Sequence, residues 1–161
     1  MISLVRVDNR LIHGQVVEAW LPHLKVDRVA VADDEAASND LIRAAMGLAV
    51  QPSVQVLIQP LGEVAYRAIS DDDVPTLLLV RDVGGVVRAR AQGLELRKLN
   101  LGNVHFSTGR RQISPSVFLS PDELDALRML SEGGVEVEVR AVPAEKGLGM
   151  AEITERFSKA G

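Results

Sequence analysis

The stretch RVDNRLIHGQVVEAW (Arg6–Trp20) contains the change from an apolar strand to an apolar helix. The run ISLVRV (Ile2–Val7), which overlaps its start, is short and nearly continuously apolar, as in strands covered on both faces of a parallel sheet. Farther along, one helical face carries Val16, Val17, Trp20, Leu21 and Leu24. A titratable ring, that of His13, therefore stands where the strand gives way to the helix.

The same alternation of strand and helix continues along the chain. Three further short apolar runs predict strands, at Asp27–Ala32, Val54–Ile58 and Thr76–Val80. Helical periodicity links Leu41, Ala45, Leu48 and Ala49, and again Leu61, Val64, Ala65 and Ala68. Strands separated by such helices predict an α/β fold with right-handed crossovers, in which helices cover both faces of a three-layer, wound, mostly parallel sheet.

The C-terminal third has different signals. Ser120 and Glu123 form a capping box around Pro121, which predicts a helix that stops at Gly133 or Gly134. The alternating run Val135–Arg140 then predicts a strand with one wet face, near a sheet edge. The segment Leu101–Ser116 is polar and long for a loop, and long ordered loops are often functional.

Composition narrows the class of protein. A chain of 161 residues is expected to form a single domain over residues 1–161, and with only 3% aromatic residues its core must be aliphatic. A net charge of −4 argues against a nucleic-acid partner. The lack of cysteine, of a signal peptide and of a long apolar run predicts a cytoplasmic protein.

The position of His13 suggests a phosphate acceptor. Ligands of wound sheets bind at the carboxyl ends of the strands, so we expect His13 to be exposed there, with Gly14 and Gln15 opening the helix. A helix N-terminus favours a phosphate, and Arg10, with Arg6, would add positive charge. No metal or cofactor is implied. The alternative is that His13 is an ordinary surface or capping residue.

Several segments resemble the IIB subunits of the mannose/fructose/sorbose family of the bacterial phosphoenolpyruvate:sugar phosphotransferase system (PTS). VRVDNRLIHGQVVEAW is similar to the family's active-site signature, approximately R-I-D-(D/S)-R-L-I-H-G-Q-V followed by a tryptophan. VDRVAVADDEAA is similar to its second strand and turn. GRRQISPSVFLSPDELDAL and GGVEVEVRAVPAEK are similar to its C-terminal half.

The resemblance implies a function. His13 would accept a phosphoryl group on Nδ1 from a IIA domain and pass it to a sugar imported through membrane IIC and IID subunits. The protein would be cytoplasmic and associated with the inner face of the membrane through IIC and IID. The family's fold adds an antiparallel strand at one sheet edge to the expectations above, and a homodimer is possible.

Given that chemistry, charge and position predict roles for the residues around His13. Arg10 and Arg6 would neutralise the transferring phosphoryl group, and the N–H groups of Gly14 and Gln15 would hold its oxygens. Asp8 would orient Arg10 or the ring; a turn or cap role is equally open. Departures from the family pattern are Asn9, and Asn103 and His105 in the segment that is usually N-V-G-G-M.

Some alternatives stay open. The chain could be a regulatory PTS module, phosphorylated on His13 without sugar transport. A nucleotide-binding protein is disfavoured because the sequence has neither of the glycine-rich phosphate-binding motifs. Arg110 and Arg111 could contact phosphate or IIA, although a solvated pair is the default. Asp33 and Asp34 fit a structural turn, and His23 fits the end of the first helix.

Overall fold

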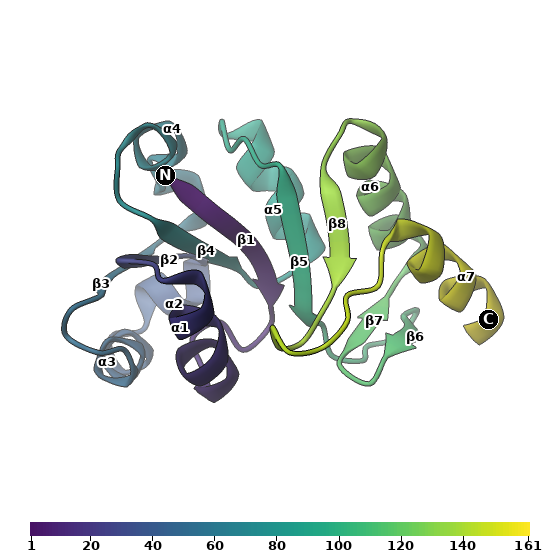
Figure 1. The fold of residues 1–161 in the computed structure, drawn as a ribbon, viewed down its shortest axis with the longest axis horizontal. Coiled ribbons are helices and arrows are strands. Elements are labelled where there is room, and N and C mark those ends of the chain that lie inside the picture. The colour runs from purple at the N-terminus through teal and green to yellow at the C-terminus, as the bar shows by residue number, and fades with distance from the viewer.

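A parallel six-stranded sheet forms the centre of the protein. The structure, a computed structural model, describes residues 1–161, and its sheet has the order β3-β2-β4-β1-β5-β8 (Figure 1). Its strands are β1 (Ile2–Asp8), β2 (Arg28–Ala32), β3 (Gln55–Gln59), β4 (Thr76–Val80), β5 (Lys98–Asn103) and β8 (Glu136–Val139). All pairings within this sheet are parallel, which confirms the predicted wound α/β architecture.

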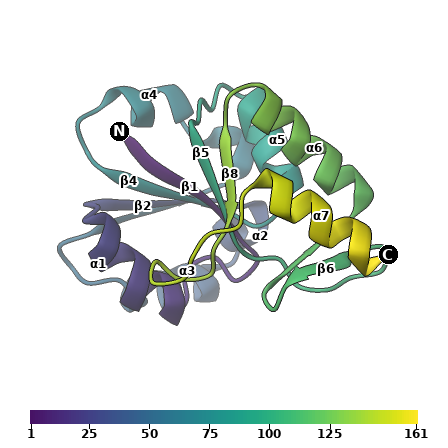
Figure 2. The same ribbon diagram turned by 45° about the vertical axis from the view of Figure 1, so that its right-hand side comes forward.

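Helices cover the two faces of the sheet and enclose two aliphatic cores (Figures 1 and 2). Alternate residues of β1 enter different cores, Leu4 one and Val5 the other, because successive side chains of a strand point to opposite faces. The core around Leu4 lies under η1 (Val16–Trp20), α1 (Leu21–Leu24), α2 (Asp34–Ser38) and α3 (Asp40–Ala49). The larger core lies under η2 (Leu61–Glu63), α4 (Tyr66–Asp71), α5 (Val83–Ala91), α6 (Pro121–Glu132) and α7 (Met150–Ala160).

The C-terminal helix signals are confirmed. The hydroxyl of Ser120 accepts from the N–H of Glu123 at 3.1 Å, and the Glu123 carboxylate accepts from the N–H of Ser120 at 3.0 Å. The helix α6 ends at Gly133, and Gly134 follows with a φ of 97°, a left-handed conformation that favours glycine.

Although residues 105–110 do form a loop, the prediction of a long loop at residues 101–116 is wrong at both ends of the segment. Its start belongs to β5, and its end forms an antiparallel hairpin of β6 (Arg111–Ser114) and β7 (Val117–Leu119). The strand β5 escaped detection because KLNLGN has no β-branched residue and includes a glycine. The helices α5 and α7 were also not predicted; two glycines at the start of α5 obscure its pattern.

The expected antiparallel strand at the sheet edge is absent. The edge strand β8 runs parallel to β5, and only one antiparallel bridge, Val139 with Leu148, extends it. The alternation of β8 is as predicted, with Val137 and Val139 in the core, but Glu138 is buried as well. Antiparallel pairing is otherwise confined to the separate hairpin of β6 and β7.

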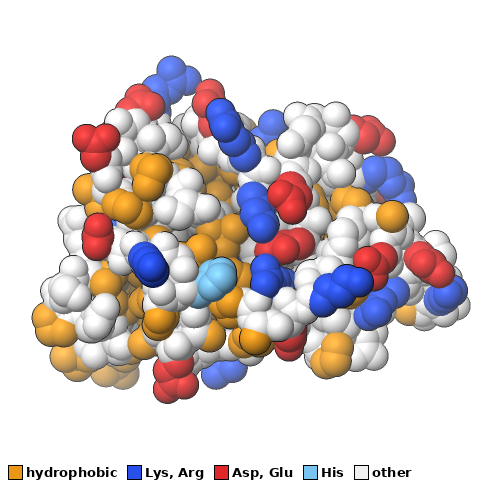
Figure 3. All heavy atoms as spheres, in the orientation of Figure 1, with side chains coloured by type: hydrophobic (Ala, Val, Ile, Leu, Met, Phe, Trp, Pro, Cys, Tyr) orange, Lys and Arg blue, Asp and Glu red, His pale blue; other side chains and the backbone are white.

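The predicted inner face of α3 is turned outward. Leu41 is 81% exposed and Leu48 87% exposed, whereas Ile42 and Met46 pack against the core. The periodicity predicted the helix correctly but not its buried face, because α3 has apolar residues on both faces. In Figure 3 hydrophobic side chains accordingly gather over the corner of the molecule where α3 lies in Figure 1.

The topology brings the segment around His13 to a switch point of the sheet. The chain leaves β1 toward η1 on one face, whereas it leaves the neighbouring strand β4 toward α5 on the other. Ligand sites of open α/β sheets lie where successive connections diverge in this way. No helix of the structure is both long and apolar enough to cross a bilayer.

Candidate active site

A tight turn joins β1 to the first helix. The N–H of Leu11 donates to the carbonyl of Asp8 at 3.0 Å, and Leu11 has a φ of 57°, which is uncommon for a residue other than glycine. Leu11 holds this conformation because its side chain is buried in the core under α1. Residues in sparsely populated conformations cluster at functional sites, and this one folds the chain so that His13 returns toward Asp8.

The ring of His13 is fixed through one nitrogen only. Its Nε2 lies 2.7 Å from Oδ2 of Asp8, whereas Nδ1 has no hydrogen-bond partner. An ionised carboxylate only accepts hydrogen bonds, so Nε2 carries a proton, and in the neutral ring Nδ1 therefore keeps its lone pair. The prediction of an exposed ring is wrong: the side chain is 7% exposed because it folds back on a polar network rather than projecting from the rim.

Asp8 is the centre of that network. Its Oδ2 accepts from Arg6 and Asn103 as well as His13, and its Oδ1 accepts from the N–H of Arg10 at 2.9 Å. Burial alone would raise the pKa of Asp8, but the hydrogen bond of His13, the charge of Arg6 and the amide of Asn103 together lower it. Asp8 therefore stays ionised and does orient the ring, in addition to bonding the turn.

Arg6 does not lie where the sequence predicted. Its side chain is fully buried, and it donates to Asp8 at 2.9 Å, to Asn100 at 2.7 Å and to Gln15 at 3.1 Å. Its guanidinium also stands 5.1 Å from the centre of the Trp20 ring. Because these partners occupy it, Arg6 acts on Asp8 in this arrangement instead of facing a phosphate.

The strand β5 contributes Gly102 and Asn103 to the network. Pairing with β1 shifts by one residue here, from Val7 opposite Leu101 to Asp8 opposite Asn103, so Gly102 is the extra residue. A Cβ on Gly102 would lie 2.0 Å from Cζ of Arg6. Only glycine leaves room for the guanidinium. The sequence shows that position 102 is a glycine but not that Arg6 packs against it.

The remaining predicted residues lie around the ring. Arg10 is exposed, and no hydrogen bond engages its side chain. Gly14 and Gln15 do open the helix, as predicted, and the first bond of that helix runs from the N–H of Val17 to the carbonyl of His13. The first N–H groups of a helix have no acceptor within it, so they are available to an anion.

The segment after β8 closes one side of the site. The indole N–H of Trp20 donates to the carbonyl of Ala141 at 2.8 Å, and Arg6 donates to the carbonyl of Arg140 at 3.3 Å. Figures 1 and 2 show this segment crossing from β8 to the end of β1. Sequence analysis missed it, because backbone carbonyls leave no sequence signal.

Other candidate residues have structural partners. Arg110 pairs with Glu123 at 2.8 Å, and Arg111 stands 4.6 Å from the ring centre of Phe157, so neither is a solvated loop cation. Asp33 caps α2 through the N–H of Ala36. Of the other candidates, Asp34 accepts a hydrogen bond from the N–H of Leu61, and the ring of His23 packs edge-on against Trp20. The side chain of His105 is exposed.

Arg81 is a cation at the same rim that sequence analysis did not identify. It is held by Asp33 at 2.8 Å, and it approaches the carbonyl of Asn9 at 3.4 Å. Asn9 lies in the turn before His13, so Arg81 ties that turn to the end of β4. The sequence places Arg81 directly after a strand, and that position was the available signal.

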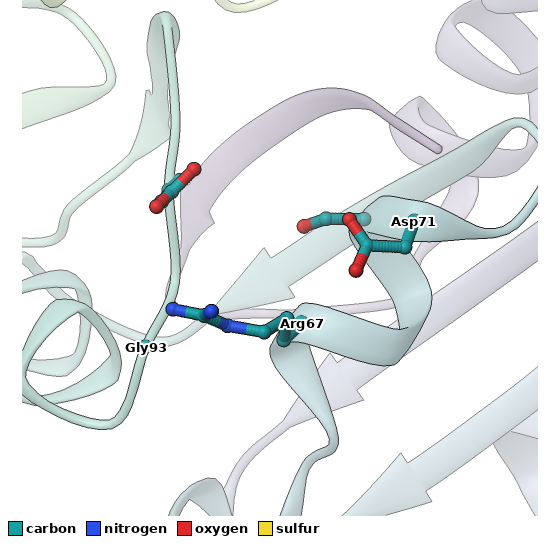
Figure 4. Close-up of a pocket in the computed structure, with 5 residues that line it drawn as sticks. Arg67, Asp71 and Gly93 are labelled. Carbon is teal, nitrogen blue, oxygen red and sulfur yellow. The ribbon is translucent and has the colours of Figure 1, made fainter.

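A polar hollow occupies the opposite rim of the sheet. It measures about 100 Å³ and is lined by Arg67, Ser70, Asp71, Gly93 and Glu95, which precede the amino ends of β4 and β5. In Figure 4 the side chain of Arg67 extends from α4 toward the segment around Gly93. This hollow lies away from the carboxyl ends of the strands, where His13 stands.

The fold and the site define an open, wound α/β protein that presents an oriented imidazole at the carboxyl rim of its parallel sheet. The family model described as "PTS system sorbose subfamily IIB component" matches residues 2–160. The chain therefore belongs to this family and is a component of a sugar phosphotransferase system.

Individual relatives agree with this membership. The "PTS system sorbose-specific EIIB component" of Lacticaseibacillus casei is 32% identical, with 99% of each chain covered. The "PTS system mannose-specific EIIAB component" of Escherichia coli K12 is 27% identical over 99% of this chain and 50% of its own length. The crystal structure of the IIBSor domain of the sorbose permease from Klebsiella pneumoniae superposes with a TM-score of 0.85 at 26% identity, covering 96% of this chain and 97% of that one.

The packing of Arg6 over Gly102 yields a stability prediction. Gly102→Ala should displace the guanidinium and break the buried pair with Asp8, which costs about 3–5 kcal/mol when one partner is lost. Urea denaturation measures this loss. The control is Gly47→Ala in α3, where a Cβ meets no atom within 4 Å and alanine should stabilise by about 0.5–1 kcal/mol. Equal stability of Gly102→Ala and the wild type would contradict the description of this contact.

Proposed function

We propose that His13 is the residue on which this IIB component carries the phosphoryl group, accepting it on Nδ1 from a IIA domain. The observation that carries the proposal is the asymmetry of the ring. Asp8 holds Nε2, and Nδ1 is left with a lone pair and no partner. An imidazole nitrogen in this state is a nucleophile, and its tautomer is set by the hydrogen bond of the other nitrogen.

The transfer is a balanced exchange of one bond for another. In the first step, the bond between phosphorus and the donor's histidine nitrogen breaks as the bond to Nδ1 of His13 forms. In the second step, a sugar hydroxyl oxygen attacks phosphorus, the hydroxyl proton passes to solvent, and His13 leaves as a neutral imidazole. Asp8 accepts from the Nε2 proton throughout, so the ring leaves without becoming an anion.

The groups around the ring supply charge compensation. Arg10 has a free guanidinium, and the N–H groups of Gly14 and Gln15 open the helix beside His13. Phosphoryl transfer depends mainly on positioning and electrostatic stabilisation, which these groups provide. Because the ring is 7% exposed, docking of the donor has to shift the covering side chains to reach Nδ1.

The partners follow from the family. A phosphotransferase IIA domain would be the donor, and the mannose-specific EIIAB relative supports this because its name joins IIA and IIB and this chain matches half of it. Membrane IIC and IID subunits would present the sugar. The protein would then act in the cytoplasm, at the inner face of the membrane.

Labelling tests the role of His13. With phosphoenolpyruvate, enzyme I, HPr and a cognate IIA, the wild type should gain one acid-labile, base-stable phosphate, and His13→Ala should gain none. His105→Ala, which removes an exposed histidine, should be labelled normally. The fold of His13→Ala should persist because Arg6 and Asn103 still bond to Asp8. Label retained by His13→Ala would refute the proposal, and label that never reaches sugar with IIC and IID present would favour a regulatory module.

Removal of the free cation tests the role of Arg10. Arg10→Ala should lower kcat for transfer from phosphorylated IIA by about 100-fold, a magnitude typical for one stabilising group, while KM for IIA changes little. The control is Arg90→Ala, which removes another exposed arginine from α5 on the other face of the sheet. Rapid-quench kinetics measures both constants, and an unchanged kcat would remove Arg10 from the mechanism.

We also propose that two copies of the chain associate through α3. Its exposed stripe has leucines at Leu41 and Leu48 with Ala44 and Ala45 between them, so an antiparallel copy can approach closely at the alanines. A two-fold axis would place each Leu41 beside the partner's Leu48, as a self-complementary interface requires. Beside Leu48 lies a hollow of about 300 Å³, lined also by Val17, Leu21 and Pro22, that widens this apolar surface.

Sedimentation tests the association. Leu48→Asp should shift the protein toward the monomer without loss of stability, because Leu48 is 87% exposed in a single chain. Met129→Asp, at a side chain that is 72% exposed on α6, is the matched control and should leave the mass unchanged. A wild-type protein that is monomeric at high concentration would contradict the interface.

A further inference from the structure

We infer that Asn103 is a positioning residue, which ties Asp8 to Gln15 and thereby fixes the nitrogen that His13 presents to its phosphoryl donor. The inference rests on the proposed function of His13. It adds a residue of β5 to which that function gives no role. Asn103 contacts neither the ring nor a reacting atom, and its action passes through the two side chains that it bonds.

The shift of register beside Gly102 is what brings Asn103 to the site. Along β5, Leu99 and Leu101 enter the larger core while Asn100 faces Arg6, so regular alternation would turn Asn103 toward the larger core. The extra residue at Gly102 reverses that alternation and aligns Asn103 with Asp8. A bulge next to a functional group commonly re-aims one side chain in this way.

The amide of Asn103 uses both of its hydrogens. Its Nδ2 donates to Oδ2 of Asp8 at 3.0 Å and to Oε1 of Gln15 at 2.9 Å. Both acceptors are oxygens, so only the NH₂ group can face them, and the amide has a single satisfactory orientation. Arg6 also donates to these same two oxygens, which locks Asp8 and Gln15 from a second direction.

We call the two hydrogen bonds from Asn103 to Asp8 and Gln15 the clamp. The clamp determines which hydrogen-bond partners face the ring of His13. With Asp8 held, its Oδ2 stays 2.7 Å from Nε2 of His13, and Oε1 of Gln15 stays directed toward Asn103 and Arg6. Without Asn103, the carboxylate and the Gln15 amide can rotate, and alternative partners for the ring become available. The proton then distributes over both ring nitrogens, so a smaller fraction of His13 keeps a free Nδ1.

The experiment compares two variants that remove the N–H donors of Asn103 in different ways. Asn103→Asp preserves shape but replaces both N–H donors by an acceptor, and Asn103→Ala removes the amide without adding charge. Asn39→Ala, which deletes the side chain that caps α3, controls for a loss of stability remote from the site. The measurements are the ¹⁵N chemical shifts of the His13 ring at neutral pH and the transfer kinetics from phosphorylated IIA.

We expect the wild type and Asn39→Ala to show protonated Nε2 and unprotonated Nδ1. In both Asn103 variants the two ¹⁵N shifts should move toward each other, and kcat should fall about tenfold with KM for IIA unchanged, as for a lost hydrogen bond to a charged group. Asn103→Asp should be affected at least as strongly as Asn103→Ala, although it fills the same space as asparagine.

Wild-type ring signals in Asn103→Asp, or in Asn103→Ala should the charged variant not fold, would overturn this inference alone. A wild-type protein that takes no label on His13 would overturn the proposed function and this inference with it. The two failures are therefore distinguishable, since the ring signals are recorded on the unphosphorylated protein without IIA.

Discussion

The buried ion pair between Arg6 and Asp8 is the contact on which the rest of the site depends. Both side chains are fully buried, and a buried charge is stable only when its partners are complete. Here Asn100 and Gln15 accept the remaining hydrogen bonds of Arg6. His13 and Asn103 donate further hydrogen bonds to Asp8. The glycine at position 102 exists for this pair, since any side chain there would occupy the place of the guanidinium.

The pair also explains why the proposed acceptor, His13, needs no catalytic base of its own. Asp8, kept ionised by its hydrogen bond with His13 and by the charge of Arg6, accepts from one nitrogen of the ring, and the other nitrogen is left without a partner. The strained turn at Leu11 returns the ring to Asp8, and the π-helical bond from the N–H of Leu21 to Val16 follows one turn later. Irregular backbone thus lies on both sides of His13, at Leu11 and in η1.

Most elements with strong periodicity could be predicted from the sequence, but α7 was missed although Met150, Ile153 and Phe157 have helical spacing. The strands β1 to β4 and the capped helix α6 were predicted, because their apolar runs and caps are local signals. Among site residues, His13, Arg10, Gly14 and Gln15 lie beside the turn as expected. The burial of Arg6, the clamp formed by Asn103 and the carbonyls of Arg140 and Ala141 were not predictable, because they arise from pairing between distant strands and from backbone atoms.

The distance along the sequence between these partners has a consequence for chains that are incompletely synthesised or folded. The side chains that orient the imidazole come from the first strand, but their partners lie as far away as Arg140, 134 positions along the sequence. A nascent or truncated polypeptide therefore has the histidine and its motif without the distant partners that hold Arg6 and Asp8 beside it. The set of partners around Arg6 is therefore complete only when the segment after β8 has joined the sheet.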